Sequence, residues 1–350
     1  MTLVSAPPLG TAGKMVDGRS MRAQVDQDLA FMDRPSTWRD ALGTGVVQQL
    51  RHRAAVHGER IALRYLDRGE REIDTATYAE LDIAALRVAT ALRSAGAVGR
   101  PVLIALPQGL DFVRCFLGCL YAGAIAIPAP ALGDPRGLER IEAIIRHARP
   151  ALIVGTADGV SRLGRDAKMS SEAFATAVDL LQGSPDSIFD DITPNNIAFL
   201  QYTSGSTSSP KGVVITHGNI AADLAMIETA FGQTDASSTV SWLPLHHDMG
   251  LIGCVLEPLH LGASAILMSP LAFLQRPARW LRALDVYGAT TAGAPNFGYD
   301  MCVRAVTDAQ IPHLDLSRWK LAFCGSEPVR ATSLARFADR FARYGFAASA

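Results

Sequence analysis

The sequence lacks the residue patterns of several common kinds of site. Its 350 residues contain no CxxC pair, no HExxH segment and no GxSxG turn. We therefore expect no metal site of the usual kinds, and nothing indicates a covalent serine intermediate. The five cysteines are scattered and odd in number, which excludes a disulfide framework and favours a reduced, cytoplasmic setting.

The charge balance is nearly even. Lysine and arginine number 33 and aspartate and glutamate 34, so the net charge is −1. Such a chain has no overall field that attracts nucleic acid or anionic lipid. The N-terminus has no basic segment followed by an apolar one, as a signal peptide does. Two uncharged stretches, 115–133 and 258–275, contain internal proline and glycine that divide them, so we expect no integral membrane contact.

The chain does contain enough apolar residues, 49% of the total, to build the cores of two subdomains. Residues 1–40 are rich in proline and glycine and predict a flexible extension without a function of its own. Residues 41–190 and 191–350 alternate short apolar runs with amphipathic segments. This alternation predicts two doubly wound α/β subdomains with parallel sheets. The less regular stretch 155–194 reads as a connector between them.

The expected elements follow from the period of the apolar residues. Thr77 and Glu80 form a possible capping box at the start of one helix. The helices are expected at 77–96, 109–122, 138–147, 220–231, after Asp248, around Trp280, after Asn296 and at 331–344. The strands are expected at 102–106, 124–127, 151–154, 197–202, 213–215, 239–243, 265–268, near Thr290 and at 320–324.

The most informative loop is 203–212, which reads Thr-Ser-Gly-Ser-Thr-Ser-Ser-Pro-Lys-Gly. A loop of such small residues can turn backbone N–H groups toward one point, and hydroxyls and a lysine add further donors for a polyphosphate. It is not a Walker A loop, because Lys211 precedes its glycine and no Ser or Thr follows. A flexible linker is the alternative, but two strand-like runs bracket the loop closely, which favours phosphate binding.

Three further loops follow expected strands, at 244–250, 294–297 and 325–328. Ligands of open α/β sheets bind at the carboxyl ends of the strands, so we expect the four loops to converge. Within Pro244-Leu-His-His-Asp-Met-Gly250, adjacent histidines rarely point at one metal ion. A core or capping histidine and a substrate-facing one both stay open, Asp248 fits an ordinary N-cap, and Glu327 fits the start of the following helix.

These segments together resemble the acyl-adenylate-forming superfamily, which includes acyl-CoA ligases and peptide-synthetase adenylation domains. The resemblance rests on Tyr202 to Gly212, on Ser241-Trp-Leu-Pro-Leu-His-His-Asp-Met-Gly-Leu-Ile252, on Ala294-Pro-Asn-Phe297 and on Gly325-Ser-Glu-Pro-Val329. It covers roughly residue 42 to the end and is most similar to the fatty acyl-AMP ligase branch. Two departures are Ser208 and Ser209, where many relatives carry a glycine, and His246, where an aromatic residue is usual.

The resemblance implies a role for each loop. The ATP phosphates would be bound by Thr203, Ser204, Gly205, Ser206, Thr207 and Lys211. The adenine and ribose would lie along Gly325, Ser326, Glu327 and Pro328. His247 would lie beside the reacting carboxylate, and Ala294, Asn296 and Phe297 beside the acyl chain. Lys211 and His247 would be the catalytic side chains.

The implied reaction is the ATP-dependent activation of a fatty acid to acyl-AMP, with pyrophosphate leaving. The acyl group would pass to an acyl carrier protein or polyketide synthase in lipid biosynthesis, or alternatively to coenzyme A. The family's main Mg²⁺ ligand, a ribose-binding aspartate and a mobile C-terminal domain are expected beyond Ala350, so the second subdomain is expected to be incomplete. A truncated form that binds nucleotide or a partner without turnover is therefore a further alternative.

Overall fold

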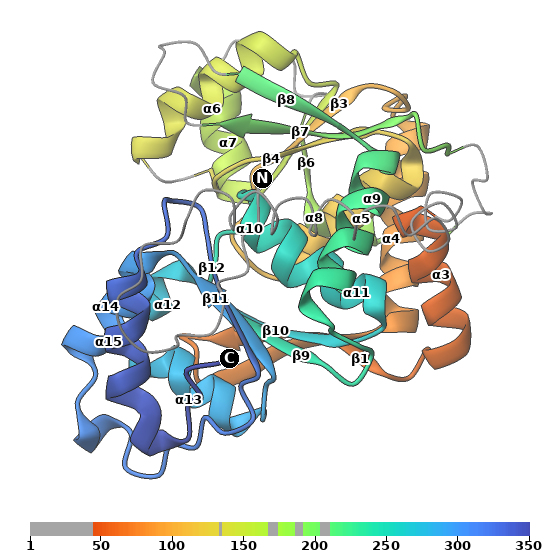
Figure 1. Ribbon diagram of the computed structural model, residues 1–350. Coiled ribbons are helices and arrows are strands. Elements are labelled where there is room, and N and C mark those ends of the chain that lie inside the picture. The colour runs from red at the N-terminus through yellow and green to blue at the C-terminus, as the bar shows by residue number, and fades with distance from the viewer. Residues whose placement is uncertain (1–44, 133–134, 167–173, 186–191, 204–210) are drawn as a thin grey trace, which may run out of the picture.

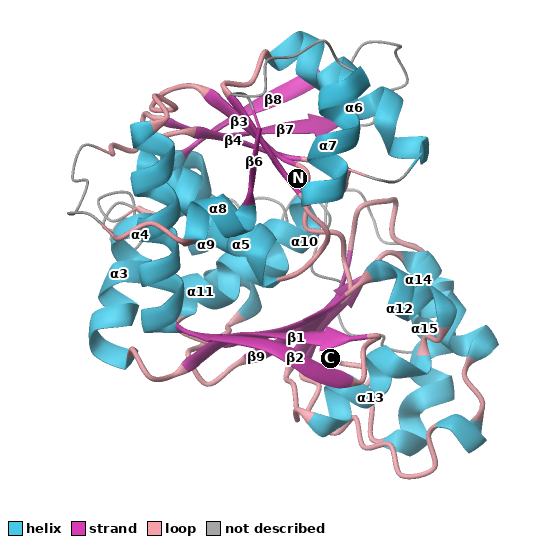
Figure 2. Ribbon diagram, turned by 180° about the vertical axis from the view of Figure 1, so that it is seen from behind, coloured by secondary structure: helices cyan, strands magenta, loops and turns pink. Residues whose placement is uncertain are grey.

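The computed structural model describes residues 45–132, 135–166, 174–185, 192–203 and 211–350. Within this part of the chain, helices and strands form two six-stranded sheets. One layer of helices lies between the sheets, and further helices cover the outer face of each sheet (Figures 1 and 2). The predicted doubly wound α/β architecture is therefore confirmed. The extension expected at residues 1–40 lies outside the described residues.

The first sheet has the strand order β6-β5-β3-β4-β7-β8. Neighbouring strands are parallel except for β7 and β8, which are antiparallel. Its strands are β3 (Pro101–Ile104), β4 (Ile125–Pro128), β5 (Leu152–Gly155), β6 (Phe174–Thr176), β7 (Ile197–Thr203) and β8 (Lys211–Thr216).

The second sheet has the order β12-β11-β9-β10-β1-β2, again parallel except for the hairpin of β1 and β2. Its strands are β1 (Ile61–Asp67), β2 (Arg71–Thr77), β9 (Ser238–Ser241), β10 (Ser264–Met268), β11 (Thr291–Ala294) and β12 (Leu321–Cys324).

The two sheets do not divide the chain at residue 190. The hairpin β1–β2 comes early in the chain but lies in the second sheet, because β1 pairs with β10. Conversely, β7 and β8 come after residue 190 but complete the first sheet, because β7 pairs with β4. This exchange differs from the expected boundary, since strand pairing joins segments that are far apart in sequence and no local pattern records it.

The helices form three layers, one between the two sheets and one on the outer face of each sheet (Figure 2). The layer between the sheets holds α3 (Val46–His57), α4 (Tyr78–Ser94), α5 (Leu110–Ala122), α8 (Ala177–Leu181), α9 (His217–Phe231), α10 (Asp248–Leu251), the π-helical turn Ile252–Leu256 and α11 (Glu257–Leu261). The outer face of the first sheet is covered by α6 (Pro135–Ala148) and α7 (Ala157–Asp166). The outer face of the second is covered by α12 (Pro270–Gln275), α13 (Ala278–Val286), α14 (Asn296–Ala305) and α15 (Ala331–Phe341), with 3₁₀ turns at Asp308–Gln310 and Ala342–Tyr344.

The buried apolar residues form three cores. Successive side chains of a strand point to opposite faces of the sheet, so one strand contributes to two cores. In β10, Ala265 and Leu267 belong to the core between the sheets, whereas Ile266 and Met268 face the outer helices. Both faces of such a strand are buried, which explains why β10 reads as an unbroken apolar run in the sequence. The same alternation in β3 supplies the central core and a third core under α6 and α7.

The expected helices and strands are confirmed, with ends shifted by a few residues. The capping box of α4 forms: the Thr77 hydroxyl accepts from the Glu80 amide at 3.2 Å, and the Glu80 carboxylate accepts from the Thr77 amide at 2.8 Å. The hairpin β1–β2 was not predicted from the sequence patterns. The stretch 155–194, expected to be a connector, supplies α7, β6 and α8.

None of the described helices is long and apolar enough to cross a membrane. The described residues of the two uncharged stretches, 115–132 and 258–275, are divided among helices, turns and strands, as their prolines and glycines predicted.

One buried carboxyl group makes the stability of this fold depend on pH. Glu257 at the start of α11 is 0% exposed, and neither carboxylate oxygen has a hydrogen-bond partner. Burial, followed by the nearby charges of Glu228 and Asp223, raises its pKa to about 8. The folded state therefore binds this proton more tightly than the unfolded chain, and stability falls as the pH rises from the ordinary carboxyl pKa through about 8.

Glu257→Gln should remove this dependence, because the amide keeps the size of the side chain without its charge. We expect the variant to gain more than about 1 kcal/mol over the wild type at pH 9, since each pKa unit corresponds to about 1.4 kcal/mol. Near pH 5 the two proteins should differ little. Urea unfolding across this pH range is the measurement. Glu228→Gln, a change at a half-exposed neighbour, is the matched control and should keep most of the dependence, because burial is the larger cause.

Candidate functional site

The loop 203–212 joins the ends of two antiparallel strands. Thr203 is the last residue of β7 and Lys211 the first of β8, they pair in register, and both are exposed. Ser204, Gly205, Ser206 and Thr207 lie outside the described residues. The loop therefore leaves the carboxyl end of β7, where the topology of an α/β sheet predicts a ligand.

Side chains from α6 hold the end of β7. A guanidinium nitrogen of Arg140 donates to the Tyr202 carbonyl at 3.0 Å, and the Tyr202 hydroxyl is 2.7 Å from Nδ1 of His147. A Cβ on Gly212 would lie 3.1 Å from the Tyr202 ring, so β8 approaches this ring closely. The sequence did not point to Arg140 and His147. Their partner, Tyr202, is some 60 residues away, and the apolar period of α6 says nothing about contacts at that distance.

A second contact joins β7 to the other sheet. The Gln201 amide donates to the His246 carbonyl at 2.9 Å. Gln201 belongs to the first sheet, whereas His246 lies in the loop that follows β9 of the second. This hydrogen bond therefore places the phosphate-loop strand beside the segment 244–250.

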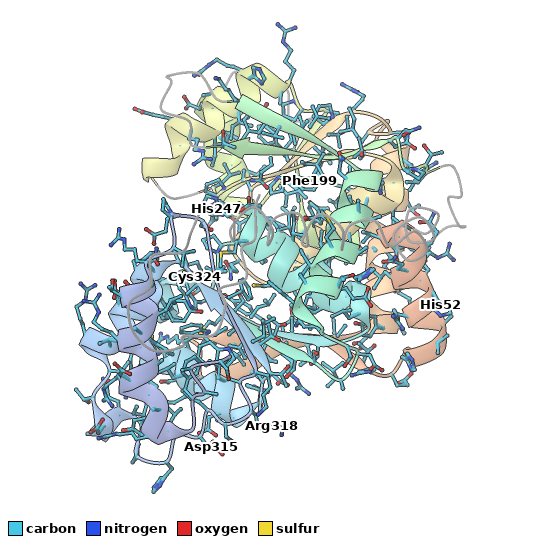
Figure 3. The ribbon with its side chains drawn as sticks, in the orientation of Figure 1. His52, Phe199, His247, Asp315, Arg318 and Cys324 are labelled. Carbon is cyan, nitrogen blue, oxygen red and sulfur yellow. The ribbon has the colours of Figure 1, made fainter. Side chains whose placement is uncertain are left out.

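The two histidines of that segment favour the neutral state. Their ring centroids are 4.5 Å apart. Burial first, then His247 and Arg140, lower the pKa of His246 to about 3. The pKa of His247 is also lowered, first by partial burial of the ring and then by the charge of Arg140, while the charge of Asp248 opposes the shift. His247, labelled in Figure 3, is the exposed member of the pair and precedes α10. At neutral pH both imidazoles are available as hydrogen-bonding groups without charge.

The loops after β11 and β12 lie side by side because these strands are parallel neighbours, with Ala294 opposite Cys324. The Asn296 side chain donates to the Pro328 carbonyl at 3.0 Å and accepts from the Arg330 amide at 2.7 Å. Asn296 was expected beside the acyl chain. Its amide is instead engaged with the backbone of the expected adenine segment, and the residue is 1% exposed.

The expected adenine segment also contacts the loop after β9. The Ser326 hydroxyl lies 3.1 Å from the sulfur of Met249, the residue that follows Asp248 in α10. Ser326 has φ of +67°, a left-handed conformation that residues with a Cβ rarely adopt. Strain of this kind persists where surrounding contacts hold the backbone, and it concentrates at binding sites.

An aromatic cluster forms the wall beside Ala294 and Phe297. Trp242 stacks on Phe273 with ring centroids 3.9 Å apart, and its edge meets the Phe297 ring at 5.7 Å. Phe297 is 44% exposed, whereas Ala294 is fully buried. A half-exposed ring backed by buried aromatic rings offers apolar surface for an alkyl chain.

The structure thus brings together the four segments that the sequence analysis singled out. Three of them follow β9, β11 and β12 of the second sheet, and β7 of the first sheet joins them through Gln201. The predicted convergence is confirmed for the described parts of these loops. Within the described residues, no group of three His, Cys, Asp or Glu side chains is placed to hold a metal ion. Mg²⁺ that accompanies ATP takes only one or two carboxylates along with phosphate oxygens, so this finding concerns only sites built from three such side chains.

The chain is similar in sequence to known proteins. Residues 50–347 match the model of the family described as AMP-binding enzyme. The chain is 37% identical to medium-chain-fatty-acid–[acyl-carrier-protein] ligase JamA of Moorena producens, over 86% of this chain and 52% of the relative. It is 38% identical to long-chain-fatty-acid–AMP ligase FadD23 of Mycobacterium tuberculosis, over 85% of this chain and 54% of the relative.

Solved structures agree with these relatives. A fatty acid AMP ligase from Legionella pneumophila matches with a TM-score of 0.80 and 39% identity, over 87% of this chain and 53% of that one. A fatty acyl-adenylate ligase from L. pneumophila, solved with acyl adenylate and pyrophosphate, matches with a TM-score of 0.78 and 38% identity, over 87% of this chain and 53% of that one. The chain spans about half the length of the curated relatives that it matches.

Removing the charge of Arg140 should raise the pKa of both neighbouring histidines, because a cation disfavours a second positive charge nearby. In Arg140→Gln we expect the pKa of His246 to rise above its value of about 3, by less than the whole shift because burial and His247 are the larger causes, and the pKa of His247 to move in the same direction. NMR titration of the imidazole Cε1–H signals measures both. Arg146→Gln, on the same helix and 71% exposed, is the control and should leave both values unchanged. Unshifted histidines in Arg140→Gln would contradict the electrostatic account.

Gly298→Ala should disturb the aromatic wall. The added Cβ would lie 2.8 Å from the Ala294 Cβ and 2.9 Å from the Trp242 ring, so the ring must move. Overpacking of this kind costs about 1–3 kcal/mol. Chemical denaturation measures the stability, and the tryptophan emission, to which all four tryptophans contribute, should shift if the surroundings of Trp242 change. Gly253→Ala is the control, because its Cβ would make only ordinary contact with Phe323 at 3.9 Å. Equal stability and emission in the two variants would show that the wall is not tightly packed.

Proposed function

The chain belongs to the AMP-binding enzyme family, and on this premise we propose that it activates a fatty acid as acyl-AMP. The observation that carries the proposal is the chain of contacts through the four loops: Gln201 to His246, Met249 to Ser326, and Asn296 to Pro328. A phosphate loop, an adenine segment and an apolar wall can act on one substrate only if they are neighbours. Names of similar proteins, fatty acid–AMP ligases and fatty acid–carrier protein ligases, agree with this class of substrate.

In the proposed reaction, a carboxylate oxygen of the fatty acid attacks the α-phosphorus of ATP. The new P–O bond forms as the bond to the bridging oxygen of pyrophosphate breaks, and pyrophosphate carries away the electron pair. Such displacement depends on alignment and charge neutralisation more than on a protein nucleophile. We assign the phosphates to Thr203, Ser204, Gly205, Ser206, Thr207 and Lys211, and the adenine and ribose to Gly325, Ser326, Glu327 and Pro328.

The electrostatics of the site suit this division of work. Lys211 supplies a positive charge at the phosphate loop. The pKa of His247 is lowered, which favours the neutral imidazole. This imidazole would orient the reacting carboxylate by a hydrogen bond. It would not form an ion pair, which would stabilise the carboxylate before it reacts. Ala294 and Phe297 would flank the first part of the acyl chain.

We propose an acyl carrier protein, or a polyketide synthase that contains one, as the acceptor, in the cytoplasm. Two relatives are named as ligases of fatty acids to acyl carrier protein. Coenzyme A is the alternative acceptor. Product analysis with both acceptors present separates them: acylated carrier protein without acyl-CoA supports the proposal, and acyl-CoA alone contradicts it. Mg²⁺ that accompanies ATP would be held mainly by the phosphate oxygens, together with one or two carboxylates of the protein.

Fatty-acid-dependent exchange of labelled pyrophosphate into ATP tests the activation step. We expect exchange that needs a fatty acid and falls at least tenfold in Lys211→Ala and in His247→Ala. The assay is run on this chain and on the longest reading frame that contains it, with saturated acids from eight to eighteen carbons. Asp339→Ala, an exposed change in α15, is the control. Exchange by neither preparation with any acid would refute the proposed activity.

A further inference from the structure

The loops that follow β11 and β12 hold each other through two oppositely directed side chains. Asn296 of the first loop binds the backbone of the second, and Glu327 of the second accepts from the Phe297 amide of the first at 3.4 Å. We name these contacts the Asn296–Glu327 clasp, and we propose that it couples the affinity for nucleotide to the affinity for the acyl chain. The inference rests on the proposed function. Asn296 and Glu327 are positioning residues within it, and each acts on the segment opposite its own.

Asn296 uses both ends of its side-chain amide. The nitrogen donates to the Pro328 carbonyl at 3.0 Å, and the oxygen accepts from the Arg330 amide at 2.7 Å. The Cys324 thiol also lies 3.6 Å from this oxygen. Because the residue is 1% exposed, water does not readily replace these partners, and an unsatisfied buried group costs about 1–3 kcal/mol. The conformation of residues 328–330 therefore depends on a side chain from the acyl segment.

Glu327 completes the clasp from the opposite direction. Its carboxylate accepts from the amide of Phe297, the residue whose ring meets Trp242. The other carboxylate oxygen lies 3.7 Å from the Arg330 guanidinium. A shift of the nucleotide segment therefore moves the acceptor for Phe297, and with it the half-exposed ring that we assign to the acyl chain.

The elements on either side of the clasp are firmly fixed. The Tyr299 hydroxyl donates to the Phe323 carbonyl at 2.9 Å, which ties α14 to β12. Asp300 of α14 accepts from Ser333 at 3.0 Å and from Arg336 at 2.8 Å, both in α15. Because strands and helices are already joined, loosening the clasp should alter the two loops and leave the fold in place.

The consequence is reciprocal. If acyl chain and nucleotide each favour the closed clasp, binding of either one should raise the affinity for the other by the same factor. Coupling of this kind gives a site that holds ATP more tightly when the acid is present. Family membership alone does not imply it, because it depends on the pairing of Asn296 with the backbone of residues 328–330.

The test is the dissociation constant of ATP with and without saturating dodecanoate, and that of dodecanoate with and without ATP. The wild type should show a several-fold gain in each, of equal size. Asn296→Ala and Glu327→Ala should each reduce the coupling factor to near one. The double variant should fall no further, because either change opens the same clasp. Glu327→Gln keeps an acceptor for the Phe297 amide and should retain most of the coupling, while Asp339→Ala should keep all of it.

The outcomes separate the clasp from the proposed function. Wild-type coupling that survives in Asn296→Ala and Glu327→Ala overturns the clasp and leaves the function standing. A wild type that binds neither ligand overturns the function, and the clasp is then decided by amide hydrogen exchange. Asn296→Ala should speed exchange at the Phe297 amide as well as at Arg330. An effect confined to Arg330 would show that the two contacts are independent.

Discussion

The site depends on the parallel order of β9, β11 and β12. Parallel strands end at the same edge of a sheet, so the three loops that follow them must meet there. Two short contacts make the meeting specific: Ser326 reaches Met249, and Asn296 reaches Pro328. The strand β7, which precedes the proposed phosphate loop, belongs to the other sheet and joins this edge through the hydrogen bond from Gln201 to His246.

The charges around this edge are distributed unevenly. Lys211 is the first residue of β8, at the end of the proposed phosphate loop, and Arg140 donates to the Tyr202 carbonyl before that loop. The histidines nearby are held toward the neutral form by burial and by Arg140. Positive charge is thus available to a polyphosphate while the neighbouring imidazoles stay uncharged. This separation suits the transfer of a nucleotidyl group to a weak nucleophile, where charge must be neutralised at the phosphates without trapping the carboxylate.

Most of the elements, and the identity of the four loops, could be predicted from local patterns. The capping box at Thr77 and the buried run of β10 are examples, because their signals lie within a few residues. The hairpin β1–β2 was missed, although Gly69 in its turn has φ of +71° and marks a hairpin of this kind. The place of this hairpin in the second sheet was even harder to predict from the sequence, because β1 pairs with β10 some 200 residues later.

The sequence by itself determined the α/β class and the membership of the AMP-binding enzyme family, since these depend on residue type and spacing. Only the tertiary structure decided which side chains serve which loop. Arg140 and His147 support β7, and Asn296 supports the segment that carries Glu327. The physical reason is that such hydrogen bonds form between segments that strand pairing brings together. The residues around one partner give no indication of where the other lies in the sequence. The sequence suggested that Asn296 contacts an acyl chain, and in the fold its side-chain amide holds the backbone of Pro328 and Arg330.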